Sequence, residues 1–244
     1  MVNQVLFYEK AKPVTKDRHR DWFVETGHDY SFARTTNSVP LMAIEFLSAG
    51  HEYAIVFAGA EEDAVVPVAI LGIEDKQNLY VTGEGSWKSN YIPAFVRRYP
   101  FIFAMDDEGK TFTLCIDEGF AGCNQEGHGR PLFDDGGKRT EYLDGVLKFL
   151  QEYQVQHQRT QAFIKRLKDL KLLEPMQANV ALKSGEKHSL AGFQVVSREK
   201  LSNLSADVVH DLFKSGALEL TYAHLQSLGN FGTTVDRLAG HRSA

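Results

Sequence analysis

One long amphipathic segment constrains the fold more than any other feature of this chain. Between residues 140 and 175, apolar or aromatic side chains recur at steps of three and four, at positions 143, 146, 147, 150, 153, 163, 164, 167 and 170. This spacing puts them on one helical face and predicts one long amphipathic helix or two joined ones. Thr140 is the expected N-cap, and Pro175 cannot lie inside the helix. Such a helix is stable only if the rest of the chain covers its apolar face.

The residues before this helix have the pattern of short strands. The expected strands are rich in β-branched and aromatic side chains, and they cover residues 5–10, 52–59, 65–73, 78–83, 100–106 and 111–119. Polar connections at 73–78 and around Gly109 predict hairpins, so the sheet should be antiparallel. The stretch 30–50 predicts a short helix, with Pro40 early in it and Gly50 at its end.

After the long helix the pattern changes again. Residues 178–197 predict a β-hairpin whose turn is Ser184-Gly185. Ser197 and Ser205 each stand where the N-cap of a short helix is expected. Strands and helices therefore both follow the long helix.

The C-terminal part predicts one more helix and then a loose end. Residues 217–230 are amphipathic and are followed by glycines, whereas residues 233–244 predict a frayed tail. The expected fold class is α+β, in one domain over residues 1–244. A strand-rich antiparallel part (1–139) would precede a part made of the long helix, the hairpin and short helices (140–232).

Composition limits the classes of function. The 244 residues include 27 Lys and Arg against 32 Asp and Glu, a net charge of −5, whereas nucleic-acid binders usually have a basic excess. No stretch approaches the roughly 20 apolar residues of a membrane span, and the N-terminus lacks the apolar run of a secretory signal. Cys115 and Cys123 have no common zinc spacing and form no disulfide framework. These features favour a soluble cytoplasmic protein with no nucleic-acid partner.

The stretch YIPAFVRRYPFIF (91–103) has two interpretations. Arg97 and Arg98, beside Tyr99, could stack on a planar ligand or bind a carboxylate. Alternatively, the prolines bound a helical turn that leads into a strand, and the aromatic side chains fill the core. The two arginines belong to no basic stripe, which favours the second interpretation.

A second candidate site is the glycine-rich loop that begins after Asp117 and Glu118. Long ordered loops often carry function. Neighbouring strand positions point to opposite faces, so these carboxylates would not act as a pair. One of them could join Asn124 or His128 in a cation site. The alternative is a solvated loop in which Asp117 caps a turn.

The helices carry a third group of candidates. His157 lies on or beside the apolar stripe of the long helix, where a hydrogen-bonded boundary histidine is more common than a ligand or base. Tyr222, His224, Gln226 and Asn230 concentrate polar groups near the end of the last helix. His224 could face the loop aspartate across a cleft. Capping and helix-to-body hydrogen bonds would account for the same residues.

No standard catalytic, zinc-protease or nucleotide-binding motif is complete in the chain. The residues therefore favour a non-catalytic accessory or interaction protein with a protein partner, which would use the 91–103 segment and the long helix. The alternative is a small-molecule-binding protein or enzyme that uses the 115–130 loop and the 217–230 helix. No metal is indicated, and the cofactor and the oligomeric state stay open.

Seven segments follow one another in a characteristic order. They are MVNQVLFYEKAKPVTKDRHRDW, NSVPLMAIEF, YIPAFVRRYPFIF, FTLCIDEGF, the helix FLQEYQ-x-Q-x-x-RT-x-AF, LEPMQA and YAHLQSLGNF. In this order they resemble the SapC family of bacterial proteins, and the resemblance extends over roughly residues 2–232. The resemblance implies an association with the surface-layer locus of a Gram-negative bacterium and with outer-membrane TonB-dependent receptors. It implies no catalytic residue set, and the peptide-transporter permease of the same name does not fit a chain without membrane spans.

Overall fold

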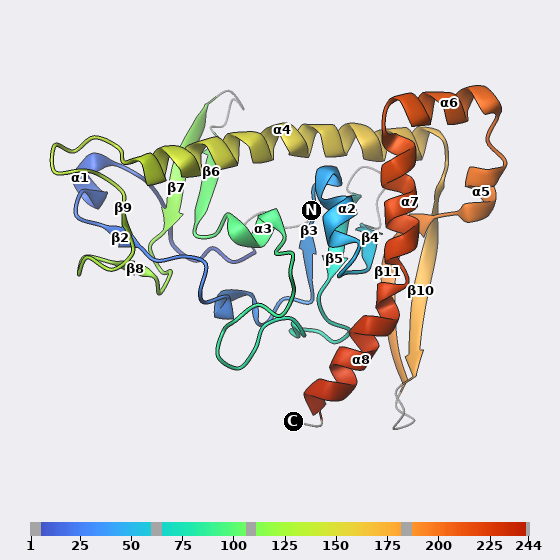
Figure 1. Cartoon of the computed structure of the whole chain (residues 1–244), viewed down its shortest axis with the longest axis horizontal. Coiled ribbons are helices and arrows are strands. Elements are labelled where there is room, and N and C mark those ends of the chain that lie inside the picture. Colours follow the sequence, from blue (N-terminus) through green and yellow to red (C-terminus); the bar gives the residue numbers. More distant parts are fainter. Residues whose placement is uncertain (1–5, 60–64, 106–110, 182–186, 243–244) are drawn as a thin grey trace.

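The computed structural model describes residues 6–59, 65–105, 111–181 and 187–242. They form an α+β fold in which antiparallel sheets are combined with one long helix and a group of C-terminal helices. Figure 1 shows α4 (Glu141–Asp169) along the upper side of the molecule, with two small sheets toward one end and the largest sheet toward the other. The predicted fold class is confirmed.

Two three-stranded sheets occupy one end of the molecule. The first has the order β1-β7-β6 and consists of β1 (Ala11–Pro13), β6 (Phe101–Met105) and β7 (Phe112–Asp117). The second has the order β8-β2-β9 and consists of β2 (Phe23–Val24), β8 (Cys123–Asn124) and β9 (Arg130–Pro131).

The largest sheet contains strands from both halves of the chain. Its order is β10-β11-β4-β5-β3, and its strands are β3 (Ser38–Pro40), β4 (Ile55–Ala58), β5 (Val66–Ile70), β10 (Leu173–Ala181) and β11 (Lys187–Val196). β11 pairs with β4 in antiparallel register, with Phe193 opposite Ala58. The predicted hairpin therefore extends a sheet that the first half of the chain begins.

The remaining helical elements are short. They are α1 (Lys16–His19), η1 (Ser31–Ala33), η2 (Ala43–Glu45), α2 (Phe46–Ala49), α3 (Ala94–Arg97), α5 (Arg198–Ser202), α6 (Ala206–Lys214), α7 (Ala217–Ser227) and α8 (Asn230–Arg242). Ser197 and Ser205 hold the N-cap positions of α5 and α6, as predicted. α7 packs against β4 and β11 and lies beside α2.

α4 is one uninterrupted helix that packs on two cores. The Thr140 hydroxyl accepts a hydrogen bond from the Leu143 amide at 3.3 Å, so the predicted N-cap is confirmed. Leu143 and Leu150 are buried against the small sheets, whereas Phe163 lies in the main core around the largest sheet. The helix ends before Pro175, because the chain turns at Lys171, whose φ is 53°. Pro175 lies in β10.

The predicted opening strand at 5–10 is wrong over its described part. Residues 6–10 form turns and bends, and the first strand is Ala11–Pro13. Phe7 is buried in the aromatic core, where its ring packs edge-on against Phe32 at 5.1 Å. Residues 6–10 are held by the packing of Phe7 in the core, and their side chains do not alternate between two faces as they would in a strand.

The prediction for residues 30–50 is correct at one end only. Gly50 follows α2 as its C-cap, as expected. Pro40, however, lies in β3 opposite Val68 rather than in a helix. β3 is the edge strand of its sheet, where a proline removes no needed donor.

The predicted strand at 78–83, with its hairpin at 73–78, is also wrong. Apart from one isolated bridge between Val81 and Trp87, the segment has no strand pairing in the described structure. The buried Asn78 side chain instead bonds one nearby and one distant backbone group: it accepts from the Tyr80 amide at 2.9 Å and donates to the Ala33 carbonyl at 3.0 Å.

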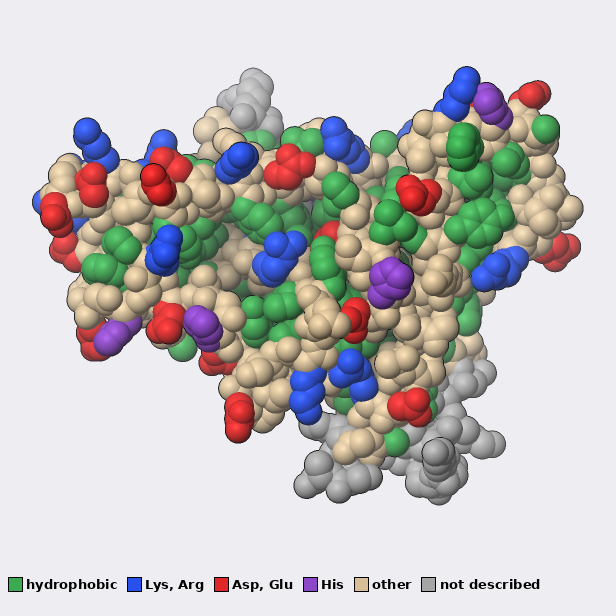
Figure 2. Space-filling model, in the orientation of Figure 1, with side chains coloured by type: hydrophobic (Ala, Val, Ile, Leu, Met, Phe, Trp, Pro, Cys, Tyr) green, Lys and Arg blue, Asp and Glu red, His purple; other side chains and the backbone are tan. Residues whose placement is uncertain are grey.

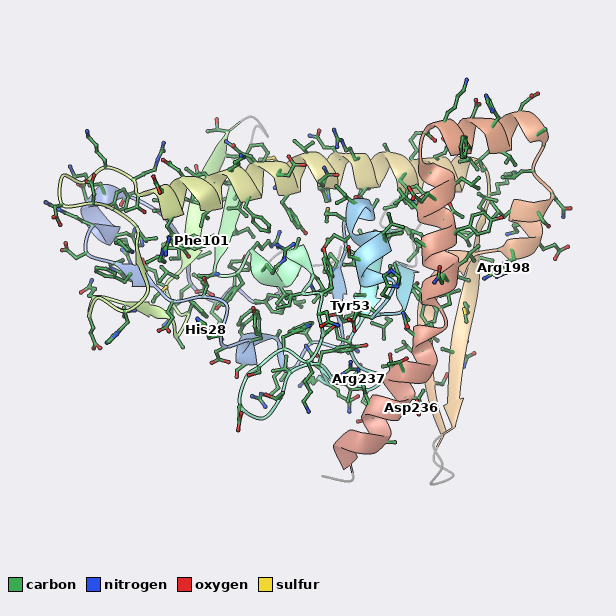
Figure 3. All side chains as sticks on the ribbon, in the orientation of Figure 1. His28, Tyr53, Phe101, Arg198, Asp236 and Arg237 are labelled. Atoms are coloured by element: carbon green, nitrogen blue, oxygen red, sulfur yellow. The ribbon has the colours of Figure 1, made fainter. Side chains whose placement is uncertain are left out.

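The predicted frayed tail is a helix. α8 buries Thr234 and Leu238 completely, and the Arg237 guanidinium lies 4.3 Å from the centre of the Tyr80 ring. Figure 3 labels Arg237 on this helix. The apolar contacts of α8 with the body stabilise it despite its glycines. The turns predicted at Gly109 and at Ser184-Gly185 lie outside the described residues.

Candidate functional site

The 91–103 segment is a junction between a helix and a core strand. Pro93 is the N-cap of α3, and β6 begins directly after Pro100. Phe95, Tyr99 and Phe101 are all buried. The interpretation of this stretch as core is confirmed, so most of it offers no surface to a partner.

The two arginines of this segment have different environments. Arg98 is buried, with its guanidinium 4.1 Å from the centre of the Phe95 ring and 5.0 Å from that of Tyr153. Arg97 is exposed, donates from Nε to the Ile92 carbonyl at 2.9 Å, and lies 5.4 Å from the centre of the Phe149 ring. Only Arg97 is placed to meet a ligand from solvent.

A pocket of about 340 Å³ lies beside Arg97, between α3 and the first half of α4. Its walls include Tyr99, Tyr142 and Phe149, and Gly145 leaves room on the helix side. Aromatic walls beside an exposed guanidinium suit a small planar anion.

Asp117 is a structural anchor at the end of β7. Its carboxylate is fully buried and accepts hydrogen bonds from the amides of Glu9, Lys10 and Gly119 at 2.9 to 3.0 Å. It also accepts from the Tyr99 hydroxyl at 3.1 Å. The carboxylate caps the turn that follows β7 and holds the N-terminal segment, and its four bonds leave it no open position for a ligand.

Glu118 lies in the turn directly after β7, so the strand alternation expected for Asp117 and Glu118 does not apply to it. It forms a bidentate ion pair with Arg18, and the hydrogen bond from Arg18 lowers the pKa of the Glu118 carboxyl. The other Glu118 contact is His19, whose Nε2 lies 3.3 Å from Oε1. His19 is fully buried, its Nδ1 accepts from the Thr15 amide, and burial lowers its pKa. This cluster fastens α1 to β7.

Asn124 and His128 organise their own loop. The Asn124 side chain accepts from the amides of Glu126 and His128 at 3.1 Å and donates to the His128 carbonyl at 2.8 Å. The His128 side chain is exposed to solvent. Within the described ranges, no group of three or more His, Cys, Asp and Glu is arranged to hold a metal ion.

His224 joins α7 to two strands of the largest sheet. Its Nε2 accepts from the Val196 amide at 3.0 Å, so Nδ1 carries the proton and donates to the Ile55 carbonyl at 2.9 Å. The side chain is fully buried, and burial lowers its pKa to about 4. Asp117 belongs to a different sheet, so the structure does not bring the predicted pair together.

The other helical candidates divide into structural and exposed residues. Asn230 donates from its side chain to the carbonyls of Gly50 and Tyr53 at 2.7 and 3.0 Å. His157 is half-buried on α4, and burial, followed by the charge of Arg98, lowers its pKa. Tyr222 and Gln226 are exposed on α7 and line a hollow of about 290 Å³ beside α2.

An open groove adjoins this hollow and was not predicted. The groove has a volume of about 660 Å³, lies between η2, α2, α4 and the start of α7, and has apolar walls formed by Ile44, Leu47, Phe163 and Leu220. Ile44 and Leu47 are 61% and 48% exposed. The groove and the hollow share Leu47 and Glu219, so they form one surface, here called the α2–α7 groove. Figure 2 shows hydrophobic side chains gathered on the face that carries α6 and α7.

The sequence contains only a weak signal for this surface. Ile44 and Leu47 flank the buried Phe46, and nothing in the pattern of apolar residues tells which of the three faces solvent. Tyr222 and Gln226 are the two members of the groove that residue chemistry singled out, although for a different site.

Three further findings bear on identity. None of the helices in the described part of the chain has the length and apolar character that a membrane crossing needs. Neither the curated proteins nor the solved structures that were compared include a match to this chain. The model of one protein family, described as SapC, matches residues 14–233. Since this match spans most of the 244 residues, the chain belongs to the SapC family.

Proposed function

We propose that this protein is a non-catalytic accessory protein that binds a protein partner through the α2–α7 groove. One contrast supports the proposal. The polar residues that resembled a catalytic set, Asp117 and His224, are fully buried and bonded within the fold, whereas Ile44 and Leu47 of the groove face solvent. Exposed apolar patches with polar rims are typical of interaction sites.

The surface-layer or outer-membrane receptor systems that the family resemblance implies are the proposed setting. A cytoplasmic location is part of the proposal, supported by Cys115 and Cys123, which are both free thiols. A protein rather than a nucleic-acid partner agrees with the net charge of −5. Cell fractionation tests the location, and recovery outside the cytoplasm would contradict it.

The groove is tested by capture of partners from the native host. We expect the double variant Ile44→Asp and Leu47→Asp to lose a stoichiometric partner that the unaltered protein retains, because two charges would enter the apolar contact. Met105→Asp is the matched control, since Met105 is 60% exposed on β6, away from the groove. Unchanged capture by the folded double variant would contradict the proposal.

Binding of a small molecule is the second candidate function. It is favoured by the pocket beside Arg97, not by the 115–130 loop and last helix on which this function was first expected to depend. Mass spectrometry of small molecules released from the purified protein tests it. A retained anion that is lost from Arg97→Met would support this function, and a protein that releases no bound molecule would oppose it.

A further inference from the structure

We infer that the occupant of the α2–α7 groove is an amphipathic α-helix of a partner, with acidic residues along the edge that faces α4 and basic residues along the edge that faces α6 and α7. This inference rests on the proposed function, because it specifies the chemistry of the partner. Helices bind apolar grooves by inserting side chains at i, i+3, i+4 and i+7. The exposed Ile44 and Leu47, three residues apart on one side of the groove, offer a surface for such a row.

The α4 wall resembles one half of a helix pair. Val155, Arg159, Ala162 and Arg166 follow one another at steps of four, three and four residues, which puts them along one line of the helix. The last three line the groove. Ala162 is small and exposed between the two arginines, so a second helix can approach closely there.

The arginines set the spacing of the acidic partner residues. Arg159 and Arg166 are two helical turns apart, about 10 Å along the axis of α4. Two carboxylates seven residues apart on a helix that lies along α4 would meet both guanidinium groups. Arginine suits this contact because its planar group binds a carboxylate through two hydrogen bonds.

The wall formed by α6 and α7 carries negative charge. Asp211 near the end of α6 and Glu219 in the first turn of α7 line the same groove. None of these four charged residues forms an ion pair with any described residue. A helix with an acidic and a basic edge would therefore neutralise both walls, whereas a helix with two like edges would be repelled by one of them.

Three synthetic helices test this arrangement. Each has about 18 residues, or five turns, and the same leucine face. The first has glutamates on one edge and lysines on the other, the second has glutamates on both edges, and the third has lysines on both. We expect the mixed helix to bind the full-length protein at least about tenfold more tightly than either uniform helix, as measured by fluorescence anisotropy.

Charge reversal of one wall should change the preference. The variant Arg159→Glu with Arg166→Glu makes both walls acidic, so it should bind the all-lysine helix best. Asp211→Lys with Glu219→Lys makes both walls basic and should select the all-glutamate helix. Lys148→Glu with Lys165→Glu is the control for the arginine variant. It lowers the net charge by the same amount at two positions of α4 outside the groove, and it should keep the preference for the mixed helix.

Several results would overturn the inference. They are no binding of the mixed helix below about 100 µM, equal binding of the three helices, and wall variants that keep the original preference. Self-association of the unaltered protein that either wall reversal abolishes would show instead that a second copy fills the groove. If the groove variants lose the native partner while no helix binds, the proposed function stands and the helical partner is wrong.

Discussion

Buried polar side chains determine how the N-terminal segment is held. Asp117 collects hydrogen bonds from three backbone amides and from the Tyr99 hydroxyl, and so it connects β7 to the chain ahead of β1. An ionised carboxylate in a fully buried position is stable only with such a set of donors.

We therefore expect Asp117→Asn to reduce the free energy of unfolding by on the order of 3 kcal/mol. In this variant the side-chain NH₂ group is itself a donor. It would face the donor groups that had bonded to a carboxylate oxygen and could not accept their hydrogen bonds. Chemical denaturation measures the loss. Glu118→Gln is the neighbouring control and should cost much less, because Arg18, its ion-pair partner, is an exposed side chain. Equal losses in both variants would refute the structural role of Asp117.

His224 makes folding sensitive to acid. Burial lowers its pKa from 6.5 to about 4, so the unfolded chain takes up a proton at this position before the folded chain does. Its contribution to stability is complete above pH 6.5 and is lost as the pH falls toward 4. The loss should reach about 3 kcal/mol, because each pKa unit corresponds to about 1.4 kcal/mol.

The measurement compares unfolding free energies of the unaltered protein and His224→Gln between pH 7 and 4.5. The variant should be less stable at pH 7 and should lose less on acidification. The difference between the proteins isolates His224 from His157, whose pKa is also lowered, and from Glu45, whose pKa burial raises. Parallel pH profiles would contradict the neutral, buried state of His224.

Among the elements, α8 is a helix although its amino-acid composition has a low helix propensity. Gly232 and Gly240 lower its intrinsic helix propensity, but Leu238 is fully buried in the main core. Contact with the body therefore provides the stability that the sequence of the helix lacks.

We expect Leu238→Ala to cost about 3 kcal/mol of unfolding free energy, since it leaves a cavity in the core. Asp236→Ala, at an exposed position of the same helix, should change the stability by less than about 0.5 kcal/mol. Thermal unfolding followed by circular dichroism measures both. A Leu238→Ala protein as stable as the unaltered one would support the frayed tail that the sequence predicted.

Local sequence signals predicted elements well where a local interaction decides them. Thr140 caps α4 and Gly50 ends α2 as expected. The failures at 6–10, 78–83 and α8 share a cause: long-range contacts, such as Phe7 in the aromatic core, outweigh the local pattern.

At the scale of the whole molecule, α4 connects two parts that the sequence presents as separate. It covers the core of the small sheets with its first half and the main core with its second half. The pairing of β11 with β4 adds a second connection across the chain. The pairing of β11 with β4 could not be read from the sequence, because it joins residues more than a hundred positions apart.

The candidate site was predictable only in part for the same reason. The sequence located the polar side chains, and Arg97 with Tyr99 do share one pocket. It could not show that Asp117 and His224 lie in different parts of the fold, nor that both side chains are buried and hydrogen-bonded. The α2–α7 groove is formed where α2, α4 and α7 meet, so it could not be predicted from any single segment of the sequence.

The central claim is that a partner occupies this groove, and site-specific photo-crosslinking in the native host tests it most directly. A photoreactive residue would replace Leu47 in the groove or, as the control, the more exposed Met105. The account predicts one discrete covalent adduct with a single protein from position 47 and none from position 105. No adduct from position 47, or the same adduct from both positions, would contradict it.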